Sequence, residues 1–278
     1  MALPFDPAVP NVARIYDYLL GGKDNYEADR ATARKILEIE PRSALAARHN
    51  RDFLRRTVRF LTGEMGIRQF LDIGSGLPTA DNVHQAAQSL APQGRIVYAD
   101  NDPVVLSHAR ALLTSSPQGT CDYVDSDLRD TANIITHAAE TLDFAQPVAV
   151  LLIAILHFIP DKDDPWDIVS RLMTAVPPGS YLVVSHATPE NFTDAASKDR
   201  LNAVYAETAA GGVTPRPLPE IRSFFSELEL VNPGLVDISA WRPAVRGIAN
   251  HSTRTLFYGG VAQKPLTARE PGNGGHPA

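Results

Sequence analysis

A glycine-containing turn at the end of an apolar segment is the most informative feature of this sequence for chemistry. The segment QFLDI runs directly into Gly74, Ser75 and Gly76. Glycines permit a tight turn and let a ligand approach the backbone closely, and the start of a following helix, expected near Asp81, offers unpaired N–H groups. The pattern is typical of a loop that binds a nucleotide-containing cofactor, although a purely structural turn fits these residues almost as well.

Acidic residues follow the next two apolar segments. Asp100 comes directly after RIVYA, and a carboxylate there can accept hydrogen bonds from both hydroxyls of a ribose. Asp127 lies just past CDYV and could accept a hydrogen bond from an adenine amino group, with Asp125 and Asp130 as rival candidates or helix caps. The alternative for Asp100 is an aspartate that caps a loop. Polar groups at three successive strand ends indicate a ligand site, because open α/β sheets bind ligands at that edge.

Several other chemistries lack their usual residues. The single cysteine, Cys121, cannot form an intramolecular disulfide, a cysteine-based metal site or a Cys-x-x-Cys redox pair. Histidines at H-E-x-x-H spacing are missing, as are the motifs G-x-S-x-G and G-x-x-x-x-G-K-[ST]. We therefore expect no bound metal and neither hydrolase nor P-loop chemistry.

The spacing of apolar residues predicts which elements position these side chains. Helical spacing between positions 12 and 19 predicts a helix that ends at the glycine pair 21–22. Ser43 could cap a second helix, whose apolar stripe includes Asn50 and which ends near Gly63. These helices precede the first predicted strand.

From Gln69 the pattern changes to short apolar segments that alternate with helix-like stretches. The segments QFLDI, RIVYA, TCDYV, VAVLLIAI and YLVVS predict a parallel sheet with right-handed crossovers, and the fully apolar fourth segment predicts a central strand. Further on we expect a helix over residues 190–207 and a short helix through Phe225. Two last strands, Leu230–Ile238 and Leu256–Ala262, should pair antiparallel.

Composition bounds the domain organisation and the partners. A chain of 278 residues with 44% hydrophobic content fits one main α/β domain. The net charge of −6 repels polyanions, and we interpret the arginines between Arg42 and Arg68 as a solvated helix face rather than a nucleic-acid site. The longest apolar run, Val148–Ile155, is too short to cross a bilayer. We expect a soluble, cytoplasmic protein with no nucleic-acid or membrane partner.

Longer segments add a family resemblance to these patterns. DIGSG, YADNDP and DSDL resemble motifs I, II and III of class I S-adenosylmethionine-dependent methyltransferases. VARIYDYLLGGKDNYEADR, HNRDFLRR, QFLDIGSGLPT and VYADNDPVVLSHARALL resemble an actinobacterial family of S-adenosyl methyltransferases, formerly a domain of unknown function. The likeness runs from about Asn11 to Pro265.

The resemblance implies an α/β, Rossmann-like class I methyltransferase fold. Its sheet would have seven mostly parallel strands and an antiparallel C-terminal hairpin, with an N-terminal helical extension. We divide the chain into a helical cap or lid over residues 1–66, a cofactor-binding domain over 67–265 and a tail over 266–278 that we expect to be disordered.

S-adenosylmethionine is the cofactor that the resemblance implies. The residues matching the family motifs are Asp72, Gly74, Ser75 and Gly76 at the methionine end, Asp100 and Asn101 at the ribose, and Asp127 and Leu128 at the adenine. Ala154, at the end of the fourth predicted strand, completes this part of the set. Pro78 occupies the region of the usual third glycine, which leaves open how the next helix starts.

The N-terminal helices could shield the cofactor from water. Asn50 and Arg51 could bind the methionine carboxylate, but Asn50 could equally be a satisfied core amide and Arg51 a surface charge. Tyr18 and Gly22, in YDYLLGGKDNY, could belong to a lid over the cofactor with the glycine pair as its hinge. A helix and turn packed there for stability alone is an equal alternative.

Methyl transfer needs placement more than it needs a base, because a sulfonium is a good leaving group. If a general base is used, His157 is the first candidate, since it ends the central fourth strand, and His186 is the reserve. A structural histidine is the favoured alternative for His157.

We therefore expect a methyltransferase whose acceptor is a small molecule. One alternative is a module that binds S-adenosylmethionine without catalysis. An NAD-dependent oxidoreductase would share the glycine turn and the ribose carboxylate, but the missing third glycine and the terminal strand pair disfavour it. Oligomeric state cannot be read from the sequence.

Overall fold

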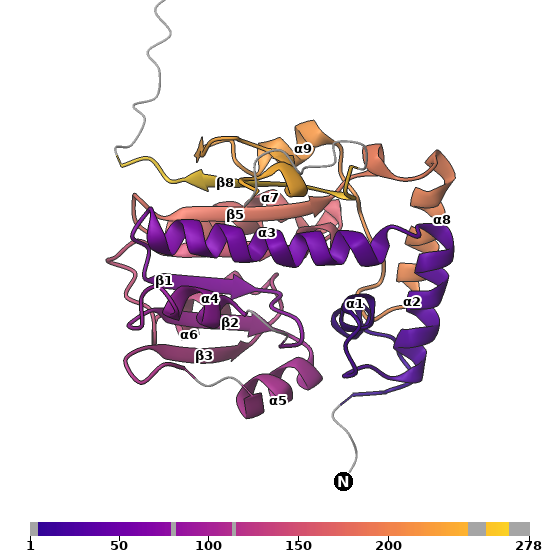
Figure 1. Ribbon diagram of the computed structural model, residues 1–278, viewed down its shortest axis with the longest axis horizontal. Coiled ribbons are helices and arrows are strands. Elements are labelled where there is room, and N and C mark those ends of the chain that lie inside the picture. Colours follow the sequence, from indigo (N-terminus) through magenta and orange to yellow (C-terminus); the bar gives the residue numbers. More distant parts are fainter. Residues whose placement is uncertain (1–4, 79–81, 113–114, 244–253, 267–278) are drawn as a thin grey trace, which may run out of the picture.

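The computed structural model describes residues 5–78, 82–112, 115–243 and 254–266. One twisted sheet runs through the molecule, with helices on both faces and a group of helices beyond one end of the strands (Figure 1). The strand order is β3-β2-β1-β4-β5-β8-β6, and β7 also pairs with β8. The predicted α/β Rossmann-like fold is therefore confirmed.

The five parallel strands are those predicted from the apolar segments. They are β1 (Gln69–Ile73), β2 (Arg95–Asp100), β3 (Thr120–Asp125), β4 (Ala149–Ile153) and β5 (Tyr181–Ala187). Because helices cover both faces of the sheet, the middle strands bury side chains on both sides, which explains their unbroken apolar runs. The segment VAVLLIAI forms β4, which lies between β1 and β5 as predicted.

The antiparallel end of the sheet differs in detail from the prediction. The strand expected over Leu230–Ile238 is two short strands, β6 (Glu229–Leu230) and β7 (Val236–Asp237). Both pair antiparallel with β8 (Phe257–Gln263). The strand breaks because Pro233 has no N–H to donate and Gly234 adopts φ +90° in a turn. Within the described residues the sheet therefore has eight strands instead of seven.

Helices on the two faces bury separate hydrophobic clusters. On one face lie α3 (Ser43–Gly63) and α4 (Val83–Gln88), with Phe53 and Trp241 packed against the sheet. On the other lie α6 (Thr131–Ala138), α7 (Pro165–Ala175) and α9 (Leu218–Ser223). Next to β3, α5 (Pro103–Leu112) packs at the edge. Alternate side chains of each strand thus pack into different clusters.

A second group of helices lies at the carboxyl ends of the parallel strands (Figure 1). It consists of α1 (Val12–Leu20), α2 (Glu27–Ile39) and α8 (Ala195–Ala206). Ile15, Leu19, Ile36 and Leu201 join these helices in one buried cluster. As predicted, α1 ends at the glycine pair, where Gly21 adopts φ +84°.

Short helical turns connect several elements. They are η1 (Leu156–Phe158), η2 (Asp161–Asp163), η3 (Pro189–Asn191) and η4 (Ile238–Ala240). The predicted helix over 190–207 begins only at Ala195, because the Asp194 carboxylate accepts a hydrogen bond from the Ser197 N–H and caps it there. Ser43 does not cap α3, since it is the first helical residue and its hydroxyl donates to the Glu40 carbonyl.

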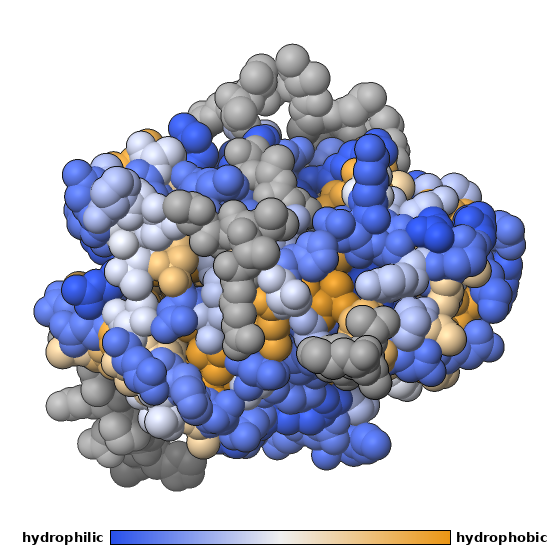
Figure 2. Space-filling view, turned by 90° about the horizontal axis from the view of Figure 1, so that it is seen from below, coloured by the Kyte–Doolittle hydropathy of each residue, from blue (hydrophilic) through white to orange (hydrophobic). Residues whose placement is uncertain are grey.

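Figure 2 shows the molecule from below relative to Figure 1. This face is mainly hydrophilic, and apolar residues gather near its middle. Among the helices of the described residues, none has the length and apolar character needed to span a membrane. Apart from Leu266, the predicted disordered tail lies outside the described residues.

Candidate functional site

A cavity of about 470 Å³ opens where the parallel strands end. Strand ends form one side of it, and α1, α3 and α8 form the other. Its volume lies within the range of about 300–1,000 Å³ that is common for small-molecule pockets. Most of the predicted site residues line it, namely Asn50, Arg51, Asp72, Gly74, Ser75, Gly76, Asp100, Asn101, Asp127, Leu128, Ala154 and His157.

The turn after β1 needs glycine at two positions. Gly74 adopts φ +72° and Gly76 φ +65°, a backbone conformation that other residues rarely adopt. A Cβ atom on Gly74 would lie 2.6 Å from Cγ1 of Ile155, which follows β4. Around Gly76, by contrast, nothing lies within 4 Å of the position of a Cβ atom. The turn therefore packs closely on the sheet at Gly74 and leaves open space at Gly76.

Asp100 is held beside this turn by two backbone N–H groups. Its Oδ2 accepts from the Gly76 N–H at 2.9 Å and its Oδ1 from the Asp102 N–H at 3.0 Å. A carboxylate has about four acceptor positions, so two remain for the hydroxyls of a ribose. Burial raises the pKa of Asp100 to about 6. This arrangement is the one expected of a carboxylate that binds a ribose.

Asp72 and Arg51 provide opposite charges on the wall of the same cavity. Asp72 is buried, and burial is the main cause that raises its pKa to about 7. The charge of Arg51 lowers this pKa, and that of Asp100 raises it. A zwitterionic amino acid carries one ammonium and one carboxylate, and each group would find an opposite charge here. The methionine end of the predicted cofactor fits this pair.

Asp127 has protein partners that the sequence did not reveal. Its Oδ2 accepts from the amide Nδ2 of Asn101 at 2.9 Å, and it forms a salt bridge of 2.9 Å with Arg129. Leu128 is buried on the cavity wall. Of the two rival candidates, Asp130 caps α6 by accepting from the Asn133 N–H, whereas Asp125 ends β3 as an exposed residue outside the cavity lining.

Both polar atoms of the Asn50 amide have hydrogen-bond partners within the protein, although Asn50 lines the cavity. Its amide donates to the Tyr16 hydroxyl at 3.0 Å, and its carbonyl accepts from the Ser185 hydroxyl at 2.6 Å. Ser185 in turn accepts from the Ala154 N–H at 3.0 Å. These bonds favour the satisfied core amide over a carboxylate ligand, and they fix the end of β4 to α3.

His157 is buried, and its Nδ1 accepts from the Ala187 N–H at 3.4 Å. Burial and the neighbouring His186 and Arg216 lower the pKa of His157 well below its usual range. The ring is therefore neutral, with its proton on Nε2, and can donate from that atom. This geometry favours a structural role for His157 over a role as general base. The general base stays a prediction.

The reserve histidine, His186, packs against a buried arginine that sequence reasoning missed. Arg216 is 1% exposed and donates to His186 Nε2 at 3.1 Å and to the carbonyls of Leu156 and Ile159. It also pairs with Asp161. Arg216 thereby fixes the loop that carries His157. The only signal in the sequence is an arginine inside a Gly/Pro-rich segment, which does not indicate its partners.

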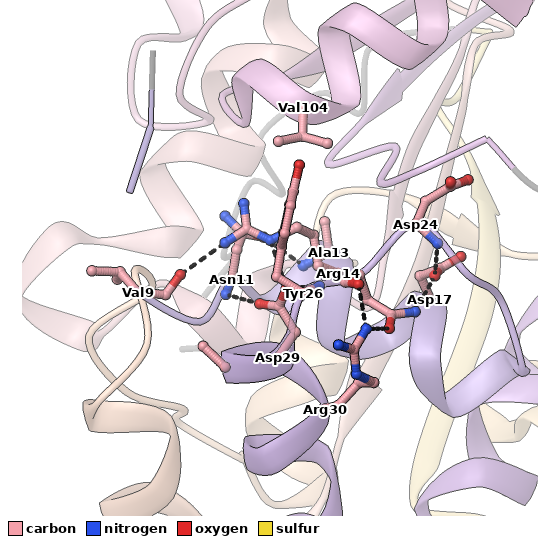
Figure 3. A network of polar contacts seen from close by, with 12 residues as sticks. Val9, Asn11, Ala13, Arg14, Asp17, Asp24, Tyr26, Asp29, Arg30 and Val104 are labelled. Carbon is pink, nitrogen blue, oxygen red and sulfur yellow. Dashed lines mark hydrogen bonds and ion pairs between the residues drawn. The ribbon is translucent and has the colours of Figure 1, made fainter. Parts of the chain in front are cut away.

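A second buried arginine, also missed, joins the N-terminal helices to the sheet. Arg14 donates to the Asp29 carboxylate at 2.9 Å and to the Val9 carbonyl at 2.8 Å (Figure 3). It also forms a salt bridge of 3.5 Å with Asp102, which lies two residues after the ribose candidate Asp100. The helical cap is therefore tied to the loop that would hold the cofactor.

Tyr18 and Gly22 do not line the cavity. Gly22 is required for a different reason, because a Cβ atom there would overlap the Asp17 carboxylate. That carboxylate accepts from the Asp24 N–H at 3.0 Å and from the Asn25 amide at 2.7 Å. Hydrogen bonds therefore fix this turn. They do not favour a hinge at the glycine pair, which stays a prediction.

Three arginines of the basic stretch hold the fold together, whereas Arg48, Arg55 and Arg59 are exposed on α3, as predicted for a solvated helix face. Arg42 donates to the Asn191 carbonyl, Arg56 to those of Ile238 and Trp241, and Arg68 to that of Thr62. In the part of the chain that the structure describes, no three His, Cys, Asp or Glu residues lie in an arrangement that could hold a metal ion.

The fold and the cavity define a class I methyltransferase-like protein. A family model described as S-adenosyl methyltransferase matches residues 2–265, so the chain belongs to the S-adenosyl methyltransferase family. S-adenosylmethionine is accordingly its cofactor. The family that the motifs resembled is thereby confirmed.

Two solved structures are similar to the whole chain. A DUF574 family protein from Streptomyces avermitilis is 42% identical, with a TM-score of 0.86, and the match covers 94% of this chain and 99% of that one. A candidate methyltransferase from Thermobifida fusca is 39% identical, with a TM-score of 0.84 and coverage of 93% and 96%.

A more distant O-methyltransferase family protein from Burkholderia thailandensis shares the fold, at 14% identity and a TM-score of 0.51, over 90% of this chain and 64% of that one. A search of curated proteins found no match.

Proposed function

We propose that this S-adenosylmethionine-dependent methyltransferase acts on a small molecule held in the cavity beside the cofactor. The observation that supports this most directly is the continuity of the cavity. It joins the glycine turn and Asp100, where the cofactor fits, to apolar walls contributed by Phe158 and Tyr205. Cofactor and acceptor can therefore share one continuous space.

The first three strand ends and Arg51 of α3 supply the cofactor-binding groups in this proposal. Asp100 accepts from the ribose hydroxyls, Asp72 faces the ammonium of the methionine end, and Arg51 faces its carboxylate. Gly74, Ser75 and Gly76 let the cofactor lie against the backbone. Leu128 contacts the adenine. That Asp127 accepts a hydrogen bond from the adenine remains a prediction. Asn101 orients Asp127 by its hydrogen bond.

When bound, S-adenosylmethionine supplies a methyl group on a sulfonium. The protein's residues hold the acceptor near that methyl group and exclude water, which are the contributions that such a displacement most needs. His157 and Ala154, which follow β4, line the cavity. In our proposal a donor at His157 Nε2 orients the acceptor.

In this proposal α1 and α2 of the N-terminal segment over residues 1–66 act as a cap on the domain over 67–265, whereas α3 of that segment packs on the sheet. The salt bridge between Arg14 and Asp102 supports the cap, because it ties α1 to the cofactor loop. We propose a cytoplasmic location, supported by the single cysteine. A small-molecule acceptor is preferred to nucleic acid, because several arginines of the basic stretch bind carbonyls of the fold.

Turnover of the cofactor tests this proposal against a non-catalytic binding module. Purified protein is incubated with S-adenosylmethionine and a broad extract of small metabolites, and S-adenosylhomocysteine is measured by mass spectrometry. We expect product with the wild-type protein and at least about tenfold less with Asp100→Asn, which weakens hydrogen bonds to the ribose. Cofactor binding without product from any extract would support the binding module instead.

A further inference from the structure

The cavity has two chemically different halves. Its acidic and basic lining residues all lie between Asp6 and Arg129, in the N-terminal segment and after the first three strands. From Ile153 to Phe257, the described lining residues include no aspartate, glutamate, lysine or arginine. We refer to these uncharged lining residues as the second half of the cavity, where the acceptor can lie beside an adenosyl-methionine group held by Asp72 and Asp100.

Aromatic side chains form much of this second half. The Phe158 ring lies 4.5 Å from the ring of His157 and 5.6 Å from that of Tyr205, between ring centres. The ring centre of Phe257 lies 5.8 Å from that of His157. Phe192 also lines the cavity. Aromatic walls at this spacing favour a planar ligand that can stack or pack edge to face.

Helices of the cap close the other side with apolar side chains. Leu201 of α8 and Leu19 of α1 are 5% and 7% exposed and face the same cavity. Ile36 of α2 lines it as well. A charged group placed against these apolar side chains would lose its hydration, and the lining residues from Ile153 to Phe257 offer it no opposite charge, which is strongly unfavourable.

Two neutral hydrogen-bond donors interrupt these apolar walls. Tyr205 lines the cavity, and among the described residues no hydrogen bond to its hydroxyl is found. Burial raises the pKa of Tyr205 to about 12, so its hydroxyl stays protonated at neutral pH. His157 accepts a hydrogen bond at Nδ1, which leaves its Nε2–H as a second donor. A hydroxyl oxygen of a ligand can accept from one of these donors and keep a lone pair for the methyl carbon.

We propose that the methyl acceptor is an uncharged, mainly apolar small molecule of the aromatic hydroxy class, recognised by Tyr205, His157 and the surrounding aromatic side chains. This inference rests on the proposed function, because it specifies the acceptor of that same site. In the reaction, the hydroxyl oxygen forms the new bond to the methyl carbon. The carbon–sulfur bond breaks with its electrons remaining on sulfur, and the hydroxyl proton passes to water.

Calorimetry on the full chain saturated with S-adenosylhomocysteine tests the charge preference. The probes are a naphthol, the naphthoate of the same ring position and the corresponding naphthylmethylammonium ion, all at neutral pH. We expect the naphthol to bind at least about tenfold more tightly than either charged probe. Equal or tighter binding of a charged probe, or no binding of the naphthol, overturns the proposal.

Variants test the named residues. Tyr205→Phe should weaken naphthol binding about five- to tenfold through one lost hydrogen bond, and Phe158→Ala about tenfold through lost ring contacts. Tyr258→Phe is the matched control, because Tyr258 lies on β8 outside the cavity lining, and it should bind naphthol like the wild type. Naphthol binding unchanged in both cavity variants contradicts the assignment.

Binding of S-adenosylhomocysteine separates the possible failures. Each variant should keep its dissociation constant for this compound within about twofold, which shows that it folds. Phe158→Leu replaces Phe158→Ala if the smaller side chain impairs folding. A wild-type protein that does not bind S-adenosylhomocysteine contradicts the proposed function, whereas one that binds it and rejects the naphthol contradicts only the acceptor class.

Discussion

At the scale of single residues, the site depends on groups that are held in conformations or environments that cost stability. Gly74 and Gly76 adopt positive φ angles, and Asp72 and Asp100 are carboxyl groups whose pKa values burial raises. Such positions are typical of functional sites, where strain and burial serve binding. The following two predictions concern Gly74 and Asp72.

Gly74→Ala should destabilise the protein by about 2–4 kcal/mol, because it combines a strained backbone with overpacking against Ile155. Gly66→Ala is the matched control. Gly66 adopts φ +73°, but nothing lies within 4 Å of its Cβ position, so we expect a cost of about 1 kcal/mol. Urea denaturation measures both values. Equal costs would show that contact with Ile155 does not restrict position 74.

Asp72→Asn should change how stability depends on pH in the absence of ligand. The folded protein holds the Asp72 proton to a pKa of about 7, above its usual value of 3.8, so wild-type stability declines as pH rises between these values. The neutral amide avoids that loss. Above pH 7 we expect the variant to be about 2–4 kcal/mol more stable than the wild type, with the difference vanishing near pH 4.

Thermal or urea denaturation across this pH range measures the effect. Asp199→Asn, on the exposed face of α8, is the control and should follow the wild-type profile. A variant that is less stable than the wild type at high pH would indicate that the pairing of Asp72 with Arg51 outweighs the cost of burial.

At the scale of elements, two buried arginines connect parts of the chain that lie far apart in sequence. Arg14 joins α1 to α2 and to the loop before α5, and Arg216 joins a Gly/Pro-rich segment to the loops after β4. Removing one member of a buried ion pair leaves the partner charge without compensation. Each arginine therefore fixes the relative position of elements around the cavity.

Arg14→Met should destabilise the protein by about 3–5 kcal/mol, because Asp29 is fully buried and loses its cation. Arg34→Met makes the same change in the solvent-exposed pair with Glu27 and should leave stability nearly unchanged. Chemical denaturation of both variants provides the comparison. Similar losses in the two variants would mean that Arg14 does not hold the cap to the sheet.

Elements that follow from a local sequence pattern could be predicted, whereas contacts between distant parts of the chain could not. Strands β1 to β5 were predicted because an apolar run between two helices is a local pattern. The break between β6 and β7 was missed although Pro233 and Gly234, residues that interrupt a strand, lie inside the predicted strand. Arg14 and Arg216 were missed because their partners lie elsewhere in the chain.

At the scale of the whole molecule, the carboxyl edge of the sheet and the helical cap together enclose the cavity. The motif residues on the first three strands were predictable, because glycines and acids at successive strand ends form a recognisable pattern. The acceptor half was not, since its walls come from η1, α8 and the start of β8. The contacts of Tyr18 and Gly22 likewise depend on how α1 and α2 pack.

The central claim is that the ends of β1 and β2 bind the adenosyl and methionine groups of S-adenosylmethionine. Isothermal titration calorimetry of the ligand-free protein with S-adenosylhomocysteine, and separately with NAD, tests this most directly. We predict saturable binding of S-adenosylhomocysteine, about tenfold or more weakened by Asp100→Asn, and no binding of NAD. Folded protein that gives no binding signal with S-adenosylhomocysteine, or that binds NAD in its place, would contradict the account.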